Sequence, residues 1–178
     1  SSDSIVISSS WAFQGSNYGF SSGGYNHTIG SYQNVIDRFS FASTATATDW
    51  GNLTQARSRT SGQSSSTHGY TCGGAKGGYS STIDRFSFTS NSGSSSWGSL
   101  TGAGGGFGGC SSETDGFTSG GTRGNLIDKF SFSSSAGAAD HGDLTSSRNG
   151  TAGHSSSDYG YVSAGSNYTT IDKFSYSS

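Results

Sequence analysis

The hexapeptide Ile36-Asp37-Arg38-Phe39-Ser40-Phe41 occurs four times in the chain with small changes. It returns unchanged at 83–88, as Ile127-Asp128-Lys129-Phe130-Ser131-Phe132, and as Ile171-Asp172-Lys173-Phe174-Ser175-Tyr176. The isoleucines that open successive copies are 47, 44 and 44 residues apart, a period typical of propellers and solenoids. A β-branched residue followed by two aromatics, between Gly- and Ser-rich stretches, predicts a strand. We take it as the third strand of a four-stranded unit.

Each copy contains further strand-like segments in a constant order. A segment ending in Gly-Gly precedes the hexapeptide, as at 69–74, and a Trp-Gly-Ser-Leu-Thr segment follows it at 97–101. The stretch from Gly105 to Ser112 then leads into the next copy and supplies a fourth strand. The loop between Gly-Gly and Ile varies in length and is longest at 25–35. Such variation is typical of one rim of a repeat protein, where binding loops lie.

The composition predicts an ordered all-β protein with a thin core. A low aliphatic content usually indicates disorder, but here the net charge is only −2 and aromatic residues make up 13 % of the chain. Nine basic residues against eleven acidic ones leave no basic excess for binding nucleic acid. No run of about 18 apolar residues is present, so membrane insertion is not expected.

The pattern resembles the kelch repeat: a strand ending in Gly-Gly, a strand ending in an aromatic, and a Trp followed by a Leu and then by an Arg (Arg57, Arg148). The chain departs from this pattern where His141 replaces Trp, Gly104 replaces Arg and Ala164 replaces the first Gly. The hexapeptide also resembles short kelch-like repeats in structural and tail-associated proteins of tailed phages. The resemblance implies a β-propeller.

We therefore expect residues 1–178 to form a single all-β domain, a propeller of four kelch-like four-stranded blades. The blades are expected at about 5–55, 56–102, 103–146 and 147–178. After Tyr176 the fourth copy has no Trp-Gly-x-Leu-Thr strand of its own, so an N-terminal strand at 1–4 is expected to complete the last sheet and close the ring. Two chains sharing an eight-bladed ring, or a larger assembly, are the alternatives.

Two kinds of residue recur at one phase of the repeat and are predicted to be structural. The first is the aspartate of each hexapeptide, interpreted as an ion-pairing or hydrogen-bonding group between neighbouring sheets. A ring of carboxylates that binds a cation or sugar hydroxyls is the alternative. Alternation along a strand sends each aspartate and the following cation to opposite faces, so each is expected to meet a partner on a neighbouring blade. The second is Trp, which is expected to pack between blades. These structural residues are Asp37, Asp84, Asp128, Asp172, Trp50 and Trp97.

The candidate ligand-binding residues lie in the variable loops at 25–35, 75–81, 122–125 and 166–169. Tyrosines in such loops are better candidates for a surface site than aromatics at a repeat phase. The candidates are Tyr25, His27, Tyr32, Lys76, Tyr79, Arg123, Asn125, Asn167 and Tyr168.

The remaining chemistry-bearing residues indicate no catalytic or metal site. Cys72 and Cys110 fall on neighbouring blades, so a disulfide or two buried thiols are both open. The four histidines share no metal-ligand spacing, and no cofactor is predicted. No nucleophile elbow, phosphate loop or zinc motif is present. Possible glycosylation sequons begin at Asn26, Asn52, Asn149 and Asn167.

The sequence thus predicts a non-enzymatic protein that lies outside a cell or on a virion. Adhesion or receptor recognition through the rim loops, with a cell-surface glycan as ligand, is the first hypothesis. The second is a purely architectural subunit whose partners are copies of itself or other structural proteins, assembled into a ring, a capsid decoration or a fibre. The third is a hydrolase or oxidase on a propeller scaffold, which would require a metal or a cluster of perturbed titratable groups in a pocket.

Overall fold

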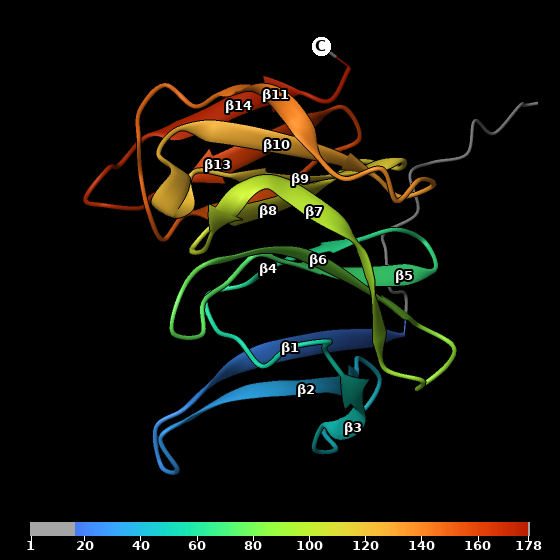
Figure 1. Cartoon of the computed structure of the whole chain (residues 1–178). Coiled ribbons are helices and arrows are strands. Elements are labelled where there is room, and N and C mark those ends of the chain that lie inside the picture. The colour runs from blue at the N-terminus through green and yellow to red at the C-terminus, as the bar shows by residue number, and fades with distance from the viewer. Residues whose placement is uncertain (1–16, 178) are drawn as a thin grey trace, which may run out of the picture.

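The structure is a computed structural model that describes residues 17–177, and it confirms an all-β protein (Figure 1). Four antiparallel sheets follow one another along the chain. Sheet 1 contains β1 (Tyr18–Asn26), β2 (Ser31–Ser40) and β3 (Thr48–Asn52). Sheet 2 contains β4 (Ser61–Ser64), β5 (His68–Cys72), β6 (Ser80–Ser87) and β7 (Ser94–Gly104). Sheet 3 contains β8 (Gly108–Ser111), β9 (Asp115–Ser119), β10 (Leu126–Ser131) and β11 (Ala139–Asp143). A 3₁₀ turn at Gly121–Arg123 lies between β9 and β10. Sheet 4 contains β12 (Ala152–Ser155), β13 (Tyr159–Ser163) and β14 (Ile171–Ser175).

Each sheet is a meander in which strands pair in chain order. The hexapeptide lies in β2, β6, β10 and β14, which is the third strand of sheets 2, 3 and 4. Within residues 17–177, sheet 1 has no strand before β1 and sheet 4 has none after β14. The two end sheets therefore have three strands where the two middle sheets have four.

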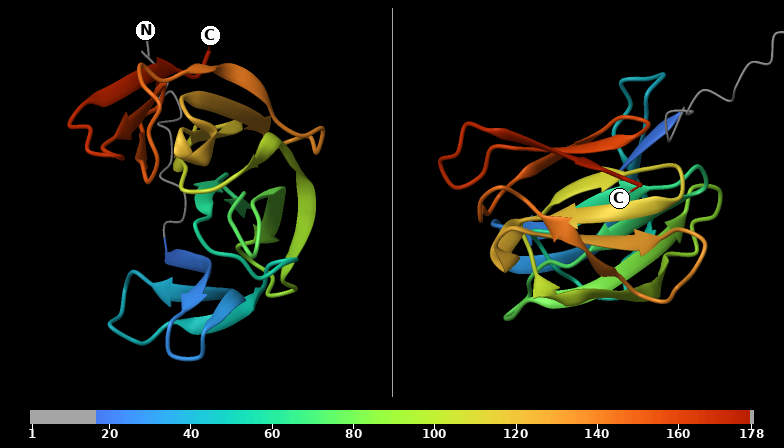
Figure 2. Two further views of the ribbon diagram at one scale, coloured as in Figure 1. Left: turned by 60° about the vertical axis from the view of Figure 1, so that its left-hand side comes forward. Right: turned by 90° about the horizontal axis from the view of Figure 1, so that it is seen from above.

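The four sheets lie side by side along an arc, with sheet 1 and sheet 4 at its two ends (Figure 2). Residues 17–177 do not form a closed ring. The closing strand predicted at residues 1–4 lies outside the described residues. The part of the predicted fold that the structure establishes is therefore four antiparallel sheets of three or four strands.

A glycine opposite a phenylalanine recurs in every sheet and explains the Gly that begins each Gly-aromatic strand. Gly116 of β9 pairs with Phe130 of β10, and the Phe130 ring covers the glycine. A Cβ atom at Gly116 would lie 2.3 Å from Cζ of Phe130, which is too close for any side chain. The same pairing occurs between Gly69 and Phe86. The ring can therefore lie flat on its neighbouring strand and pack against the preceding sheet, as Phe86 does on Phe20 and Phe130 on Tyr70.

Three small hydrophobic clusters lie between successive sheets and form the core. In the interface between sheets 2 and 3, Tyr70 stacks on Phe132 with ring centroids 4.7 Å apart and packs against Phe130 at 5.5 Å. Equivalent stacked pairs join Phe20 to Phe88 and Phe117 to Tyr176. The second aromatic of the last three hexapeptides thus packs across the interface with the preceding sheet.

Candidate functional site

Three of the four hexapeptide aspartates, Asp84, Asp128 and Asp172, join neighbouring sheets. Asp84 in sheet 2 accepts hydrogen bonds from the backbone N–H and Oγ1 of Thr54, at 2.9 and 2.7 Å, just after the last strand of sheet 1. Nη1 of Arg57 lies 3.0 Å from the same carboxylate, and both side chains are buried. Asp128 and Asp172 accept the same pair of bonds from Thr101 and Thr145. A β-bulge between Ile and Asp accompanies the turn of the carboxylate toward the preceding sheet in β6 and β10.

The interface between sheets 2 and 3 obtains its arginine from a different place. Gly104 occupies the position of Arg57 and Arg148, and the guanidinium that binds Asp128 and Thr101 comes from Arg123 in the 3₁₀ turn. A Cβ at Gly104 would lie 2.8 Å from Cγ of Arg123, so the Arg123 side chain fills the space next to Gly104. Arg123 was predicted as a rim-loop ligand residue, whereas the structure directs its side chain into an interface.

Hydrogen bonds from Trp also cross the interfaces. Nε1 of Trp50 donates to the Ser87 carbonyl at 2.8 Å, and Nε1 of Trp97 donates to the Ser131 carbonyl at 2.9 Å. His141 replaces Trp in sheet 3, and its Nε2 lies 2.8 Å from the Ser175 carbonyl. An imidazole N–H can therefore replace the indole N–H at this position.

Three of the four cations that follow the aspartates lie closely over an aromatic ring of their own sheet, which differs from the expectation of a neighbouring blade. Lys129 meets the expectation in part, because its Nζ donates to the Tyr176 carbonyl of the fourth copy at 3.1 Å and also lies 3.5 Å from Asp115 of its own sheet. The guanidinium of Arg85 lies 3.8 Å from the ring centroid of Trp97, and that of Arg38 lies 4.0 Å from that of Trp50. Lys173 lies over the ring of Tyr159 at 3.6 Å. In β6 and β14 the aspartate thus accepts hydrogen bonds from the Thr that follows the last strand of the preceding sheet, while the cation lies over an aromatic ring of its own sheet.

The carboxylate of Asp172 shows the electrostatic consequence of these contacts. Burial acts to raise its pKa, but the hydrogen bonds from Thr145 and the guanidinium of Arg148 outweigh burial and lower the pKa below the ordinary value of 3.8. The shortest distance between the Arg148 Nη2 and the Asp172 carboxylate is 2.6 Å. The charged form of this aspartate is therefore the form that the fold stabilises.

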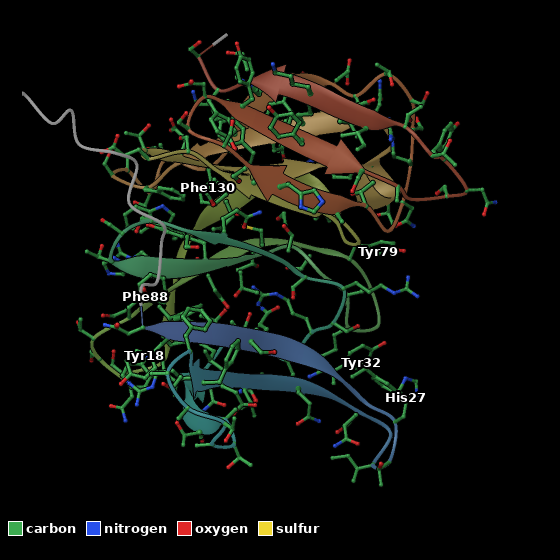
Figure 3. All side chains as sticks on the ribbon, turned by 180° about the vertical axis from the view of Figure 1, so that it is seen from behind. Tyr18, His27, Tyr32, Tyr79, Phe88 and Phe130 are labelled. Carbon is green, nitrogen blue, oxygen red and sulfur yellow. The ribbon has the colours of Figure 1, made fainter. Side chains whose placement is uncertain are left out.

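Four of the predicted ligand residues line one hollow on the loop rim of sheets 1 and 2. Tyr25, His27, Tyr32 and Tyr79 surround a space of about 500 Å³ together with Arg59. The rest of the lining comes from small residues, Ser58, Ala75, Gly77 and Gly78. Figure 3 shows His27, Tyr32 and Tyr79 on one side of the sheets, opposite Tyr18 and Phe88. We name this space the rim hollow.

The β1–β2 hairpin positions one wall of the rim hollow. Tyr25 and Tyr32 face each other across the two strands, and their ring centroids lie 5.0 Å apart in an edge-to-face contact. His27 packs edge-to-face on Tyr25 at 4.9 Å. The side chain of Asn26 accepts hydrogen bonds from the backbone N–H groups of Thr28 and Ile29, which shapes the tip of the hairpin. The aromatic wall is thus held by local interactions.

The opposite wall comes from the second copy and from the segment that joins the two sheets. Ala75 pairs with both Ser58 and Tyr79, which ties the Tyr79 loop to the joining segment. Arg59 has a backbone φ of +58°, a conformation uncommon for a non-glycine residue. Of the residues that the structure describes, it is the one Lys, Arg, Asp or Glu that lines the hollow, and its side chain is exposed. Neither Ser58 nor Arg59 lies in a loop that was predicted to vary in length, so neither was predicted as a ligand residue.

The other predicted ligand residues do not line the rim hollow. Lys76 and Tyr79 line a second, neighbouring hollow of about 380 Å³. The Asn125 carbonyl accepts a hydrogen bond from the backbone of Leu144, and Asn167 lies in a turn of sheet 4 with a φ of +70°. Tyr168 is exposed on that loop, 5.4 Å from the guanidinium of Arg148. The predicted candidates therefore do not form one continuous site.

Both cysteines are free and buried, so the structure has two thiols rather than the disulfide that the sequence left open. Cys72 and Cys110 lie in the cores of two different interfaces, and Cys110 contacts the Tyr161 carbonyl at 3.6 Å. Burial raises the pKa of Cys72 well above its ordinary value and that of Cys110 to about 11. Such thiols are poor nucleophiles.

Several further features bear on the class of site. All four sequon asparagines are exposed. Among residues 17–177, no group of three or more His, Cys, Asp or Glu side chains could hold a metal ion. No helix in the described part of the chain is long and apolar enough to cross a membrane.

The geometry thus defines an all-β repeat protein with charged interfaces and an aromatic rim hollow. No protein-family model matches the chain, and no curated protein matches it.

Proposed function

We propose that this chain is a non-enzymatic binding module that recognises a glycan in the rim hollow. The observation that carries the proposal is the convergence of Tyr25, His27, Tyr32 and Tyr79 with the guanidinium of Arg59 around one open space. A sugar ring has an apolar C–H face that packs on an aromatic ring. Its hydroxyl groups need donors and acceptors such as phenol, imidazole and guanidinium groups.

The positive charge of Arg59 in the rim hollow favours glycans that carry an acidic group. Among residues 17–177, Arg59 is the one permanent charge that lines the hollow, and no carboxylate of this part of the chain lines it. A glycan that carries a carboxylate, sulfate or phosphate group would pair with this guanidinium, whereas a neutral glycan would leave its charge without a counter-ion. Acidic sugars are therefore the preferred ligands.

The wider setting is proposed on the resemblance in sequence. A kelch-like propeller of the kind found in tailed-phage structural proteins would act on a virion or outside a cell, where adhesion to surface glycans is useful. The four consecutive antiparallel sheets and their repeated interfaces are consistent with an arc of such blades.

A glycan array probed with the full chain tests the proposal, followed by titration of any sugar that binds. Tyr79→Ala is expected to weaken binding at least about tenfold, because stacking on an aromatic ring and its hydroxyl contact are both lost. Tyr168→Ala is the matched control, since Tyr168 is similarly exposed but lies on the loop of sheet 4. The proposal would be wrong if no glycan binds, or if Tyr79→Ala and Tyr168→Ala weaken glycan binding equally.

A purely architectural role is the second candidate, favoured by apolar repeat positions exposed at both ends of the arc. Phe41 is 55 % exposed and Ile171 is 67 % exposed, although their counterparts at the internal interfaces are buried or partly buried. Light scattering coupled to size exclusion tests this role. A particle larger than the 18.1 kDa chain supports assembly, and a monomer at high concentration contradicts it.

A further inference from the structure

The outer edge of β14 is a strand edge whose counterpart is covered in each other sheet. In sheets 1, 2 and 3 the hexapeptide strand pairs on that side with β3, β7 and β11. Among the described residues no strand pairs with β14 on that side. An uncovered edge of this kind presents backbone N–H and C=O groups that can pair with another chain.

Within residues 17–177, Ile171, the first residue of β14, also lacks the apolar contacts that its counterparts have in the other sheets. Ile36, Ile83 and Ile127 are 0–2 % exposed, whereas Ile171 at the same position is 67 % exposed. Each covered isoleucine belongs to a core cluster that also contains the leucine in or directly after the adjacent outer strand: Leu53, Leu100 or Leu144. Ile171 therefore lacks the contact that a Trp-Gly-x-Leu-Thr strand supplies elsewhere.

The internal sheets also give the geometry of the missing strand. Ile36 pairs with Gly51 and Ile127 with Gly142, so the glycine lies opposite the isoleucine. The leucine N–H then donates to the carbonyl two residues before the isoleucine, as Leu53 does to Asn34 at 2.6 Å and Leu144 to Asn125 at 2.7 Å. At β14 the equivalent acceptor is the carbonyl of Thr169.

From these repeated contacts we propose that β14 accepts an extended segment of the pattern aromatic-Gly-x-Leu-Thr from a second polypeptide. The segment adds antiparallel to β14, places its glycine opposite Ile171 and covers Ile171 with its leucine. Strand addition to an exposed edge obtains affinity from backbone hydrogen bonds and specificity from the alternate side chains. This inference does not depend on the rim hollow, which is lined by residues of sheets 1 and 2 and of the segment that joins them. Sheets 1 and 4 lie at opposite ends of the arc (Figure 2).

The test uses the full chain and a labelled synthetic peptide with the sequence of residues 48–57, Thr-Asp-Trp-Gly-Asn-Leu-Thr-Gln-Ala-Arg. Fluorescence polarisation is expected to show saturable binding. A peptide in which the leucine is replaced by serine should bind about tenfold or more weakly, because the buried leucine provides most of the apolar contact.

Two matched chain variants locate the binding site. Ile171→Ser is expected to weaken the peptide about tenfold or more, and Ile29→Ser is expected to leave binding unchanged, since Ile29 is equally exposed at 66 % but lies on the β1–β2 hairpin. Both side chains are largely in solvent, so both variants should fold, which melting by circular dichroism checks.

Hydrogen exchange of the β14 amides distinguishes an edge that is free to bind a second polypeptide from an edge that another part of the same chain already covers. Amides that exchange rapidly in the chain alone and slow on peptide addition support the proposal. Amides already protected without peptide, with no peptide binding, assign this edge to another part of the same chain and overturn it. Equal loss of binding in the Ile171 and Ile29 variants also overturns it.

Discussion

The guanidinium of Arg123 binds the carboxylate of Asp128, five residues further along the chain, at the interface where Gly104 stands in the place of an arginine. Elsewhere Arg57 and Arg148 reach the corresponding aspartates from the segment that follows the outer strand. The interface has thus kept its positive charge while changing the residue that supplies it. An aspartate buried next to a Thr hydroxyl needs such a partner, because an unpaired buried carboxylate is costly.

Replacing Arg123 by Ala is expected to destabilise the protein by about 3 kcal/mol, since it leaves the buried Asp128 without its cation. The midpoint of urea unfolding measures the loss. Lys76→Ala, at an exposed lysine in the corresponding loop of the second copy, is the control and should change stability by less than about 0.5 kcal/mol. Similar unfolding midpoints for the two variants would contradict a structural role for Arg123.

Adding an arginine at position 104 to the Arg123→Ala variant should restore part of the lost stability. Two of the three atoms nearest to a Cβ at position 104 belong to Arg123, and the third is Cζ of Phe107 at 2.7 Å, so removing the Arg123 side chain frees space for a residue at 104. In the presence of Arg123 the same Gly104→Arg change should be destabilising, because the two side chains compete for one space. Equal effects of Gly104→Arg in the two backgrounds would show that the positions are not coupled.

The repeated aspartates offer an internally matched comparison. Asp84→Asn should cost about 3 kcal/mol because it removes the charge that pairs with the buried Arg57 and weakens the bonds from Thr54. Asp37→Asn should cost much less, since Asp37 has no Thr or Arg partner among residues 17–177 and is partly exposed. Chemical denaturation measures both. A large loss at Asp37 would disagree with this account and would indicate a partner outside the described residues.

Stability should fall in acid, in part because of Asp172. The folded-state pKa of this carboxyl lies below its ordinary value, so the carboxylate stabilises the fold above the unfolded-state pKa, near 3.8. This contribution is lost as the pH falls below that value and through the folded-state pKa. Urea midpoints measured from about pH 7 down to about pH 3 should decline more steeply for the natural chain than for Asp172→Asn. Parallel curves would contradict this assignment.

The two buried thiols should be inert in the folded protein. Burial raises the pKa of Cys110 to about 11 and that of Cys72 well above its usual range, so little thiolate exists near neutral pH. A thiol reagent should therefore titrate no groups under native conditions and two after denaturation. Rapid reaction of either cysteine in the native state, or an intact mass two protons lighter before reduction, would contradict the structure.

The sequence by itself determined the strands, their order and the number of units, because these follow from local patterns repeated along the chain. The hexapeptide, the Gly-Gly segment and the Trp-Gly-x-Leu-Thr segment each describe one strand, and a glycine that faces a phenylalanine ring leaves a signal in both positions. An inter-sheet role for the aspartates was also predictable, since one residue type at one phase of a repeat indicates a repeated contact. Four of the nine predicted ligand residues gather in the rim hollow for the same local reason: they lie in neighbouring variable loops.

Only the tertiary structure decided which side chains meet across the interfaces. It showed that Arg123 replaces the arginine missing at Gly104, that Arg85 covers the tryptophan of its own sheet, and that Arg59 joins the aromatic wall of the rim hollow. These contacts depend on the distance and rotation between two packed sheets and on the path of each connecting loop. Neither is encoded by the period of a strand, because periodicity specifies the face on which a side chain lies and not the neighbour that it contacts there.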